Sequence, residues 1–173
     1  LIIGAVLVVL GFTIFAIIMT VNHWDFSRLS TVKYVTNTHS FSEAVTDISI
    51  KTATADILFA LSEDDSCKVV CHEQENLLHT VALQDGTLTI RQTDERKWYD
   101  YVGISFGSTK ITLYLPQSIY GMLTVGASTG NVTLPKEFGF ESMEISITTG
   151  DIRTSASVSG IAKLKTSTGD IRV

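Results

Sequence analysis

Apolar and polar residues alternate throughout the last third of the chain, around a short phrase that occurs three times. Each copy contains a glycine followed by Asn or Asp, and the glycines, Gly130, Gly150 and Gly169, recur at a nearly constant interval. Apolar residues occupy every second position on both sides of each glycine. This period of two is typical of half-buried β-strands, whereas a helix needs apolar spacings of three and four. Each repeat is therefore predicted to form a strand, a turn and a second strand.

The turn residues have a physical reason to recur. Glycine adopts positive φ without a Cβ clash, and Asp or Asn hydrogen-bonds nearby backbone, so the chain bends at the same place in each copy. Repetition at a short fixed period indicates units that stack at about 4.8 Å. We predict an all-β fold, a β-solenoid of the β-helix or β-roll kind, with one rung for each glycine-to-glycine interval, about 20 residues. The predicted turn residues are Thr129, Gly130, Asn131, Thr149, Gly150, Asp151, Thr168, Gly169 and Asp170.

An earlier, degenerate copy of the repeat covers residues 48–59. Its apolar positions match those of the later copies, but Ala55 stands where they have glycine, which predicts a turn with less demanding backbone angles. Between this copy and the later ones, residues 67–71, 80–83, 87–90 and 110–115 have strand character. Asp85-Gly86 is a hairpin signal, and we expect antiparallel pairing in this region.

The N-terminal segment 1–22 carries no charge, and within it positions 1–21 form an apolar run. At ~1.5 Å per residue a helix of this length spans about 31 Å, enough to cross a hydrocarbon core. We interpret it as a transmembrane helix and not as a cleaved signal peptide, because the run is long and lacks a small-x-small site. Residues 22–40 are predicted to be a stalk and residues 41–173 the solenoid domain. Because Ile171 and Val173 would leave an uncovered apolar rung, we expect the domain to continue beyond Val173.

Charge and aromatic residues supply two candidate contact surfaces. The net charge is −5, which argues against nucleic acid as a partner. Arg153 and Arg172 occupy equivalent outward positions of successive rungs, with Lys163 and Lys165 on the adjoining strand. These residues form either a contact for an anionic envelope polymer or an ordinary solvated surface. Aromatic residues of the stretch 94–108 belong either to a binding loop or to a flap that seals the solenoid wall: Trp98, Tyr99 and Tyr101.

No catalytic, cofactor-binding or metal-binding residues are predicted. The string from Gly103 to Gly107 matches G-x-S-x-G, but it leads into a strand and lacks the strand-to-helix elbow that a nucleophilic serine needs. Cys67 and Cys71 are four residues apart, which is about 13 Å along a strand. Unless the strand bends, this distance excludes a disulfide between them and a metal ion bound by both. We therefore predict that both cysteines are core residues. The Asn131, Asp151 and Asp170 ladder is interpreted as turn capping, since calcium-binding β-rolls need more carboxylates.

Several segments together resemble a known family: 85–90, 97–100, 111–116 and the repeated Ser/Thr-Thr-Gly-Asp-Ile phrase. They are similar to the bacterial "putative adhesin" β-strand-repeat domain of unknown function, and to the Lia-type envelope-stress proteins. The resemblance covers about residues 41–173. It implies a β-solenoid on the outer side of a cell envelope, behind a single-pass membrane segment, and it brings no catalytic residues.

Two function classes follow from these observations. The first is a non-enzymatic, membrane-anchored module for binding, adhesion or envelope-stress sensing, whose partners are envelope polymers or another envelope protein. The alternative is a passive structural protein that extends by stacking rungs. Neither class requires a cofactor, nucleic acid or a small-molecule substrate.

Overall fold

The computed structural model describes residues 2–25, 32–93 and 107–173, and its described part is mostly β with one N-terminal helix. Helix α1 (Ile2–Val21) contains no acidic or basic residue. Within it, Ile3–Val21 is long and apolar enough to cross a membrane, judged by length and composition. The sequence-based expectation of one apolar helix followed by a β domain is confirmed.

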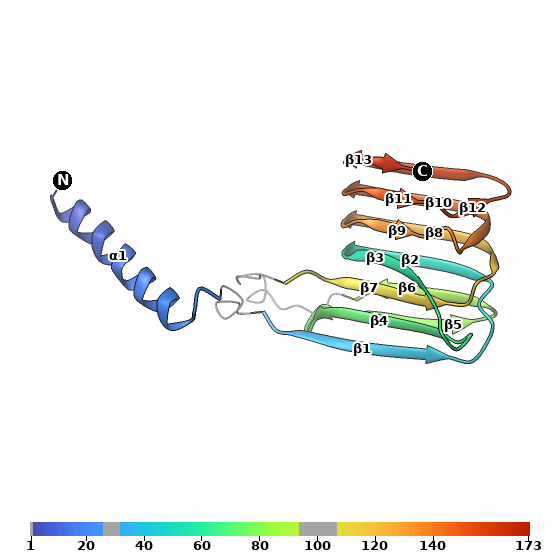
Figure 1. The fold of residues 1–173 in the computed structure, drawn as a ribbon, viewed down its shortest axis with the longest axis horizontal. Coiled ribbons are helices and arrows are strands. Elements are labelled where there is room, and N and C mark those ends of the chain that lie inside the picture. The colour runs from blue at the N-terminus through green and yellow to red at the C-terminus, as the bar shows by residue number, and fades with distance from the viewer. Residues whose placement is uncertain (1, 26–31, 94–106) are drawn as a thin grey trace.

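The described strands form two seven-stranded sheets, and Figure 1 shows the strands stacked one above another along the domain. Sheet A contains, in spatial order, β1 (Tyr34–Phe41), β4 (Cys67–Gln74), β7 (Lys110–Leu115), β3 (Asp56–Leu61), β9 (Val132–Leu134), β11 (Ile152–Thr154) and β14 (Ile171–Arg172). Sheet B contains β5 (His79–Gln84), β6 (Thr87–Gln92), β2 (Asp47–Thr54), β8 (Ile119–Thr129), β10 (Gly139–Thr149), and then β12 (Ser157–Val158) and β13 (Ala162–Thr168), which both pair with β10.

The register between the repeats is the one that the sequence alignment predicts. In sheet B, Val125 of β8 lies between Ile50 of β2 and Ile145 of β10, and Ile145 is followed by Leu164 of β13. All of these pairs are parallel. Sheet A shows the same order, with Val132 of β9 between strands β3 and β11. The earlier copy, residues 48–59, is therefore a true member of the stack.

The prediction of one uniform solenoid is only partly correct, because the sheets do not close into a continuous coil. Strands β2 and β3 lie between the β6/β7 layer and the β8/β9 layer, so the order in space differs from the order in the chain. Antiparallel pairs occur at the end of the stack that holds the earlier strands, where β4 joins β1 and β7, and β5 joins β6. The β5–β6 hairpin was predicted: Asp85 and Gly86 have φ of 49° and 76°, which suits a two-residue hairpin turn.

The predicted stalk, residues 22–40, also needs correction at its C-terminal end. Tyr34–Phe41 forms β1, which pairs antiparallel with β4 along its whole length. The inward positions of β1 include Asn37 and His39, so the apolar alternation that marks a strand is weak there. The folded domain thus begins at Tyr34, ahead of the predicted boundary at Phe41.

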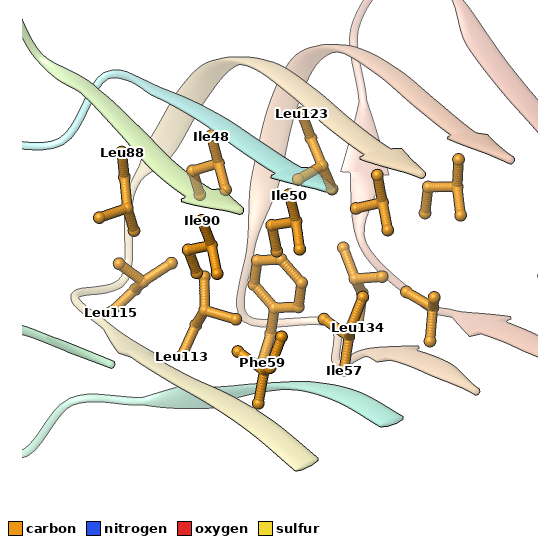
Figure 2. Close-up of a cluster of buried hydrophobic side chains, with 14 of the residues drawn as sticks. Ile48, Ile50, Ile57, Phe59, Leu88, Ile90, Leu113, Leu115, Leu123 and Leu134 are labelled. Carbon is orange, nitrogen blue, oxygen red and sulfur yellow. The ribbon is translucent and has the colours of Figure 1, made fainter. Parts of the chain in front are cut away.

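The core lies between the two sheets. Side chains from both sheets point toward one another, as Ile48, Ile50 and Leu123 do toward Phe59 and Leu113 in Figure 2. Cys67 and Cys71 are buried, free thiols on the inner face of β4, which confirms their predicted place in the core. Burial raises the pKa of Cys67 to about 11, and burial together with the Glu73 charge raises the pKa of Cys71 to about 12.

Candidate functional site

The repeat turns are joined by a ladder of side-chain hydrogen bonds, which we call the turn ladder. The backbone N–H of Asn131 donates to Oδ1 of Asp56 at 2.8 Å, and that of Asp151 donates to Oδ1 of Asn131 at 3.0 Å. The N–H of Asp170 donates in turn to Oδ1 of Asp151 at 2.9 Å. Each Asx side chain therefore accepts from the next turn along the stack, which leaves these oxygens occupied by protein donors.

The turn glycines are required by both their backbone angles and their close stacking. Gly130, Gly150 and Gly169 have φ between 133° and 135°. A Cβ on Gly150 would lie 2.1 Å from the carbonyl oxygen of Gly130, and one on Gly169 would lie 2.1 Å from that of Gly150. Ala55 is not among the described residues with positive φ, as the sequence predicted for a turn without glycine. The turn glycines therefore allow the repeats to stack closely, which leaves no room for a ligand between successive turns.

The structure separates the basic residues that the sequence grouped together. Arg153 and Arg172 are neighbours on sheet A, and they pair with the carboxylates of Asp151 and Asp170 in their own repeats. Lys163 and Lys165 lie on β13 of sheet B. Because the inner faces of both sheets meet in one core, the outward residues of the two sheets lie on opposite sides of the domain. The expected patch is thus divided between two faces. The aromatic candidates Trp98, Tyr99 and Tyr101 lie outside the described residues.

The outer face of sheet B brings other residues together in straight rows, because the parallel register is kept from strand to strand. One row, which we call the Arg91–Lys165 row, crosses five strands and contains Arg91, Lys51, Gly126, Ser146 and Lys165. Its neighbours on the same face include the hydroxyl residues Thr89, Ser49 and Thr124. This face therefore combines hydroxyl groups with the carboxylate of Glu144 and with four cations, in a chain whose net charge is −5: Arg91, Lys51, Lys163 and Lys165.

A pocket of about 480 Å³ opens at one end of this row. It is lined by Lys51, Thr52, Ala53, Leu77, Arg91, Gln92 and Ser128. Lys51 and Arg91 are exposed partners on adjacent parallel strands. Within residues 32–93 and 107–173, no carboxylate pairs with either cation. Lys51 and Arg91 were not predicted from the sequence, since Lys51 belongs to the degenerate repeat and the strand neighbours of Arg91 could not be known.

Behind this pocket, polar side chains replace apolar ones at the end of the core. His79, Gln92 and Thr52 occupy one row of sheet B, and Glu73 projects from the inner face of β4. Glu73 is fully buried, and its Oε2 accepts from both the backbone N–H and Nδ1 of His79 at 2.6 Å. Its Oε1 accepts from Nδ2 of Asn37 at 2.8 Å. We call these residues, together with Thr52 on Nε2 of His79 at 2.9 Å, the buried polar network.

The buried polar network includes the one set of metal-ligand types that converges in the described chain. Sγ of Cys71 and ligand atoms of Glu73 and His79 lie within 4.8 Å of one another. Both Glu73 oxygens and both His79 nitrogens already have protein partners, and the raised pKa of Cys71 disfavours the thiolate that a metal would need. The arrangement fits a structural network better than a metal centre. His72, the histidine next to Cys71, faces outward and stacks on Tyr34 with ring centroids 5.3 Å apart.

Neither His79 nor Glu73 was among the residues that the sequence pattern singled out. A signal was present, because Cys67, Val69, Cys71 and Glu73 alternate on one strand, so Glu73 belongs to the inner face whenever the cysteines do. A carboxylate at an inward position needs buried donors. Which donors they are depends on β5 and β1, and those contacts are not visible in local patterns.

Stacked strand-turn-strand repeats with stacked glycine turns place this protein in the class of β-strand-repeat domains. Within that class, the chain belongs to the family described as Toastrack DUF4097, whose model matches residues 45–173. This agrees with the resemblance to "putative adhesin" repeat domains that the sequence showed. No curated protein matches the chain.

Several solved structures are similar at low identity. A "putative cell adhesion protein" from Clostridium sporogenes has 8% identity and a TM-score of 0.46, with 82% of this chain and 98% of that chain covered. A "putative adhesin" from Bacteroides fragilis has 15% identity and a TM-score of 0.36, with 81% and 96% covered. A "putative lipid binding protein" from Parabacteroides distasonis has 12% identity and a TM-score of 0.31, with 79% and 93% covered. None of these three names describes an enzyme, and the names belong to those proteins.

Proposed function

We propose that this protein is a non-enzymatic, membrane-anchored binding module of a bacterial cell envelope, and that the outer face of sheet B is its contact surface. The observation that carries the proposal is the parallel register of β6, β2, β8, β10 and β13, which sets hydroxyl and cationic side chains in straight rows. Neighbouring side chains within a row lie about 4.8 Å apart, and this regular spacing suits the repeating groups of a linear polymer. Adhesion or stress sensing would use the same surface.

The anchor in this proposal is α1, retained as a single transmembrane helix with the β domain on the extracytoplasmic side. Support comes from the 19 residues of Ile3–Val21, which match the thickness of a hydrocarbon core, and from the adhesin-like family. Protease added to intact protoplasts should remove the β domain and leave a membrane-protected fragment containing α1. Full protection of the β domain in sealed protoplasts would contradict this orientation.

Binding is tested with the full chain in zwitterionic detergent micelles and with washed cell-wall fractions. We expect the chain to sediment with wall fractions, and the variant Ser146→Glu to weaken this binding because it places a negative charge in the Arg91–Lys165 row. Thr38→Glu is the matched control, since Thr38 is exposed on β1 of sheet A. Equal binding by both variants and the wild type would exclude sheet B as the contact face.

The same experiment addresses the alternative of a passive structural protein. A chain that binds no wall fraction but self-associates in light scattering would support assembly by stacking and would overturn the binding proposal. A chain that binds wall polymer as a monomer would support the binding module.

A further inference from the structure

We propose that the pocket between β6, β2 and β8 binds the phosphate group of an anionic polymer, such as one built of phosphodiester units. This inference deepens the proposed function and rests on it, because it names the chemical group that the outer face of sheet B recognises. It is carried by three independent features of the pocket: its charge, its free hydrogen-bond donor and its shape.

The charge of the pocket is positive, and no described residue compensates it. Lys51 and Arg91 are directly paired on adjacent strands, where like charges destabilise a sheet. The other neighbours of these two cations on the same face are uncharged, namely Ser49, Ala53, Thr80, Thr89, Thr93 and Gly126. By contrast, Arg153 and Arg172 on sheet A each have a carboxylate partner. A bound phosphate group, which carries one negative charge in a phosphodiester, would reduce the repulsion between Lys51 and Arg91, as the carboxylates do for the arginines on sheet A.

A donor without a partner belongs to Gln92, which lines the same pocket as the two cations. Oε1 of Gln92 accepts from the backbone N–H of Ala53 at 2.7 Å and from Oγ1 of Thr52 at 3.4 Å. These bonds fix the orientation of the amide, because the Ala53 N–H needs an acceptor. Nε2 of Gln92 is then left buried and without a partner among the described residues. A buried amide donor without an acceptor is costly, and an oxygen of a bound phosphate group would reduce this cost.

The shape of the pocket favours a phosphate group that belongs to a larger molecule. Next to Lys51 the row continues with Gly126, where an added Cβ would meet nothing within 4 Å. The missing side chain leaves open space in the row between Lys51 and Ser146. The volume of about 480 Å³ lies in the range of small-molecule sites, and it accommodates part of the group that carries the phosphate. Arginine and lysine are the usual side chains for such a ligand.

The test uses the full chain, isotope-labelled, in zwitterionic micelles, and titrates inorganic phosphate at constant ionic strength. We expect the backbone amide signals of Ala53 and Gly126 to shift and to saturate. The double variant Lys51→Ala/Arg91→Ala should lower the phosphate affinity at least ~10-fold, because it removes both charge-assisted contacts. Lys68→Ala/Lys110→Ala is the charge-matched control, because both lysines are exposed on sheet A, and it should change the affinity by less than about twofold.

Two results would overturn the inference. One is the absence of saturable shifts at Ala53 and Gly126. The other is an equal loss of affinity in both double variants, which would mean diffuse electrostatic attraction instead of a site. Both double variants are first compared with the wild type by thermal unfolding. Since Lys51 and Arg91 are exposed, we expect their unfolding midpoints to be unchanged.

A second experiment distinguishes a polymer from a lipid headgroup as the source of the phosphate group. It also distinguishes failure of the pocket inference from failure of the proposed function. Poly(glycerol phosphate) should compete with inorganic phosphate for the pocket, while soluble phosphatidylglycerol nanodiscs should compete poorly. Preferential competition by the nanodiscs would overturn the polymer assignment in favour of a lipid headgroup. If wall fractions bind Lys51→Ala/Arg91→Ala as well as wild type, the pocket inference fails and the proposed function stands. If phosphate saturates the pocket but no wall fraction binds, the proposed function fails.

Discussion

The two ends of the β domain differ in how their strands pair and in which side chains fill their inner faces. In the later repeats, from β8 to β14, the strands of successive rungs pair in parallel, the turns stack glycine on glycine, and the inner face is almost entirely apolar. At the other end, β1, β4 and β5 pair antiparallel with their neighbours, and the core includes Glu73 and His79.

The difference shows that a repeat provides packing partners inside the stack but not at its end. A repeat gives each rung a neighbour of the same shape, so one backbone geometry satisfies every turn. The end of a stack has no such neighbour, and its edge strand and polar groups need separate partners. Here β1 covers β4, and Asn37 of β1 donates to Glu73. The antiparallel strands thus serve as the cap of the repeat stack.

The largest expected effect is at the cap. Glu73→Ala removes the acceptor of three hydrogen bonds and leaves His79 and Asn37 with buried, unpaired donors. We expect a loss of about 3 to 5 kcal/mol in the free energy of unfolding, measured by urea titration of the full chain in micelles. Glu75→Ala is the control, because Glu75 is exposed and should change stability by less than about 0.5 kcal/mol. Equal stability of the two variants would show that the buried polar network does not hold the cap.

The next effect is in the repeats. Gly150→Ala places a Cβ against the Gly130 carbonyl at a φ of 135°. We expect a loss of roughly 2 to 4 kcal/mol from backbone strain and overpacking, by the same urea titration. The matched change at the start of the stack is Ala55→Gly, which should cost only about 1 kcal/mol because Ala55 needs no positive φ. A Gly150→Ala variant as stable as wild type would disprove the stacked-turn geometry.

Alkaline pH should weaken the cap side of the core. The pKa values of Cys67 and Cys71 are raised from 9.0 to about 11 and about 12, so the unfolded chain releases these protons first. The stability held by the neutral thiols is complete below pH 9 and decreases as the pH rises toward 11 and 12, by about 1 kcal/mol per thiol at pH 10. Urea titrations from pH 8 to 10 measure this slope. Cys67→Ala/Cys71→Ala should reduce it, and an unchanged slope would assign it to other groups.

The smallest effect is in the turn ladder. Asp151→Ala removes the acceptor of the Asp170 N–H and should cost about 1 kcal/mol. Asp151→Asn keeps a side-chain oxygen at that place and loses only the ion pair with Arg153, which is partly exposed, so it should cost less than about 0.5 kcal/mol. Thermal unfolding of the two variants distinguishes the ladder from the ion pair. If Asn were as damaging as Ala, the ion pair would be the more important contact.

Local patterns were sufficient to predict the regular part of the fold. Alternation identified the repeat strands, and glycine spacing identified the turns of the later repeats and the positions that match between copies, such as Ile50 and Val125. The Asp85-Gly86 hairpin and the apolar α1 helix were equally visible. These features depend on short-range sterics and on burial of one face, both of which are encoded within a few residues.

The candidate site was not predictable in the same way. Lys51, Arg91 and Gln92 come from two distant segments of the chain, and nothing in either segment indicates that they are neighbours. The basic residues that the sequence did group, Arg153 and Lys165, lie on opposite faces because each rung turns from one sheet to the other.

The sequence by itself determined the strands, their inward faces and the turn geometry of each repeat, because side-chain alternation and glycine backbone freedom are local properties. Only the tertiary structure decided which strands became neighbours: β2 and β3 lie between two later layers, and β1 covers β4. Strand order depends on long-range pairing and on the satisfaction of buried groups such as Glu73, and these are properties of the assembled core, for which no single segment carries the information.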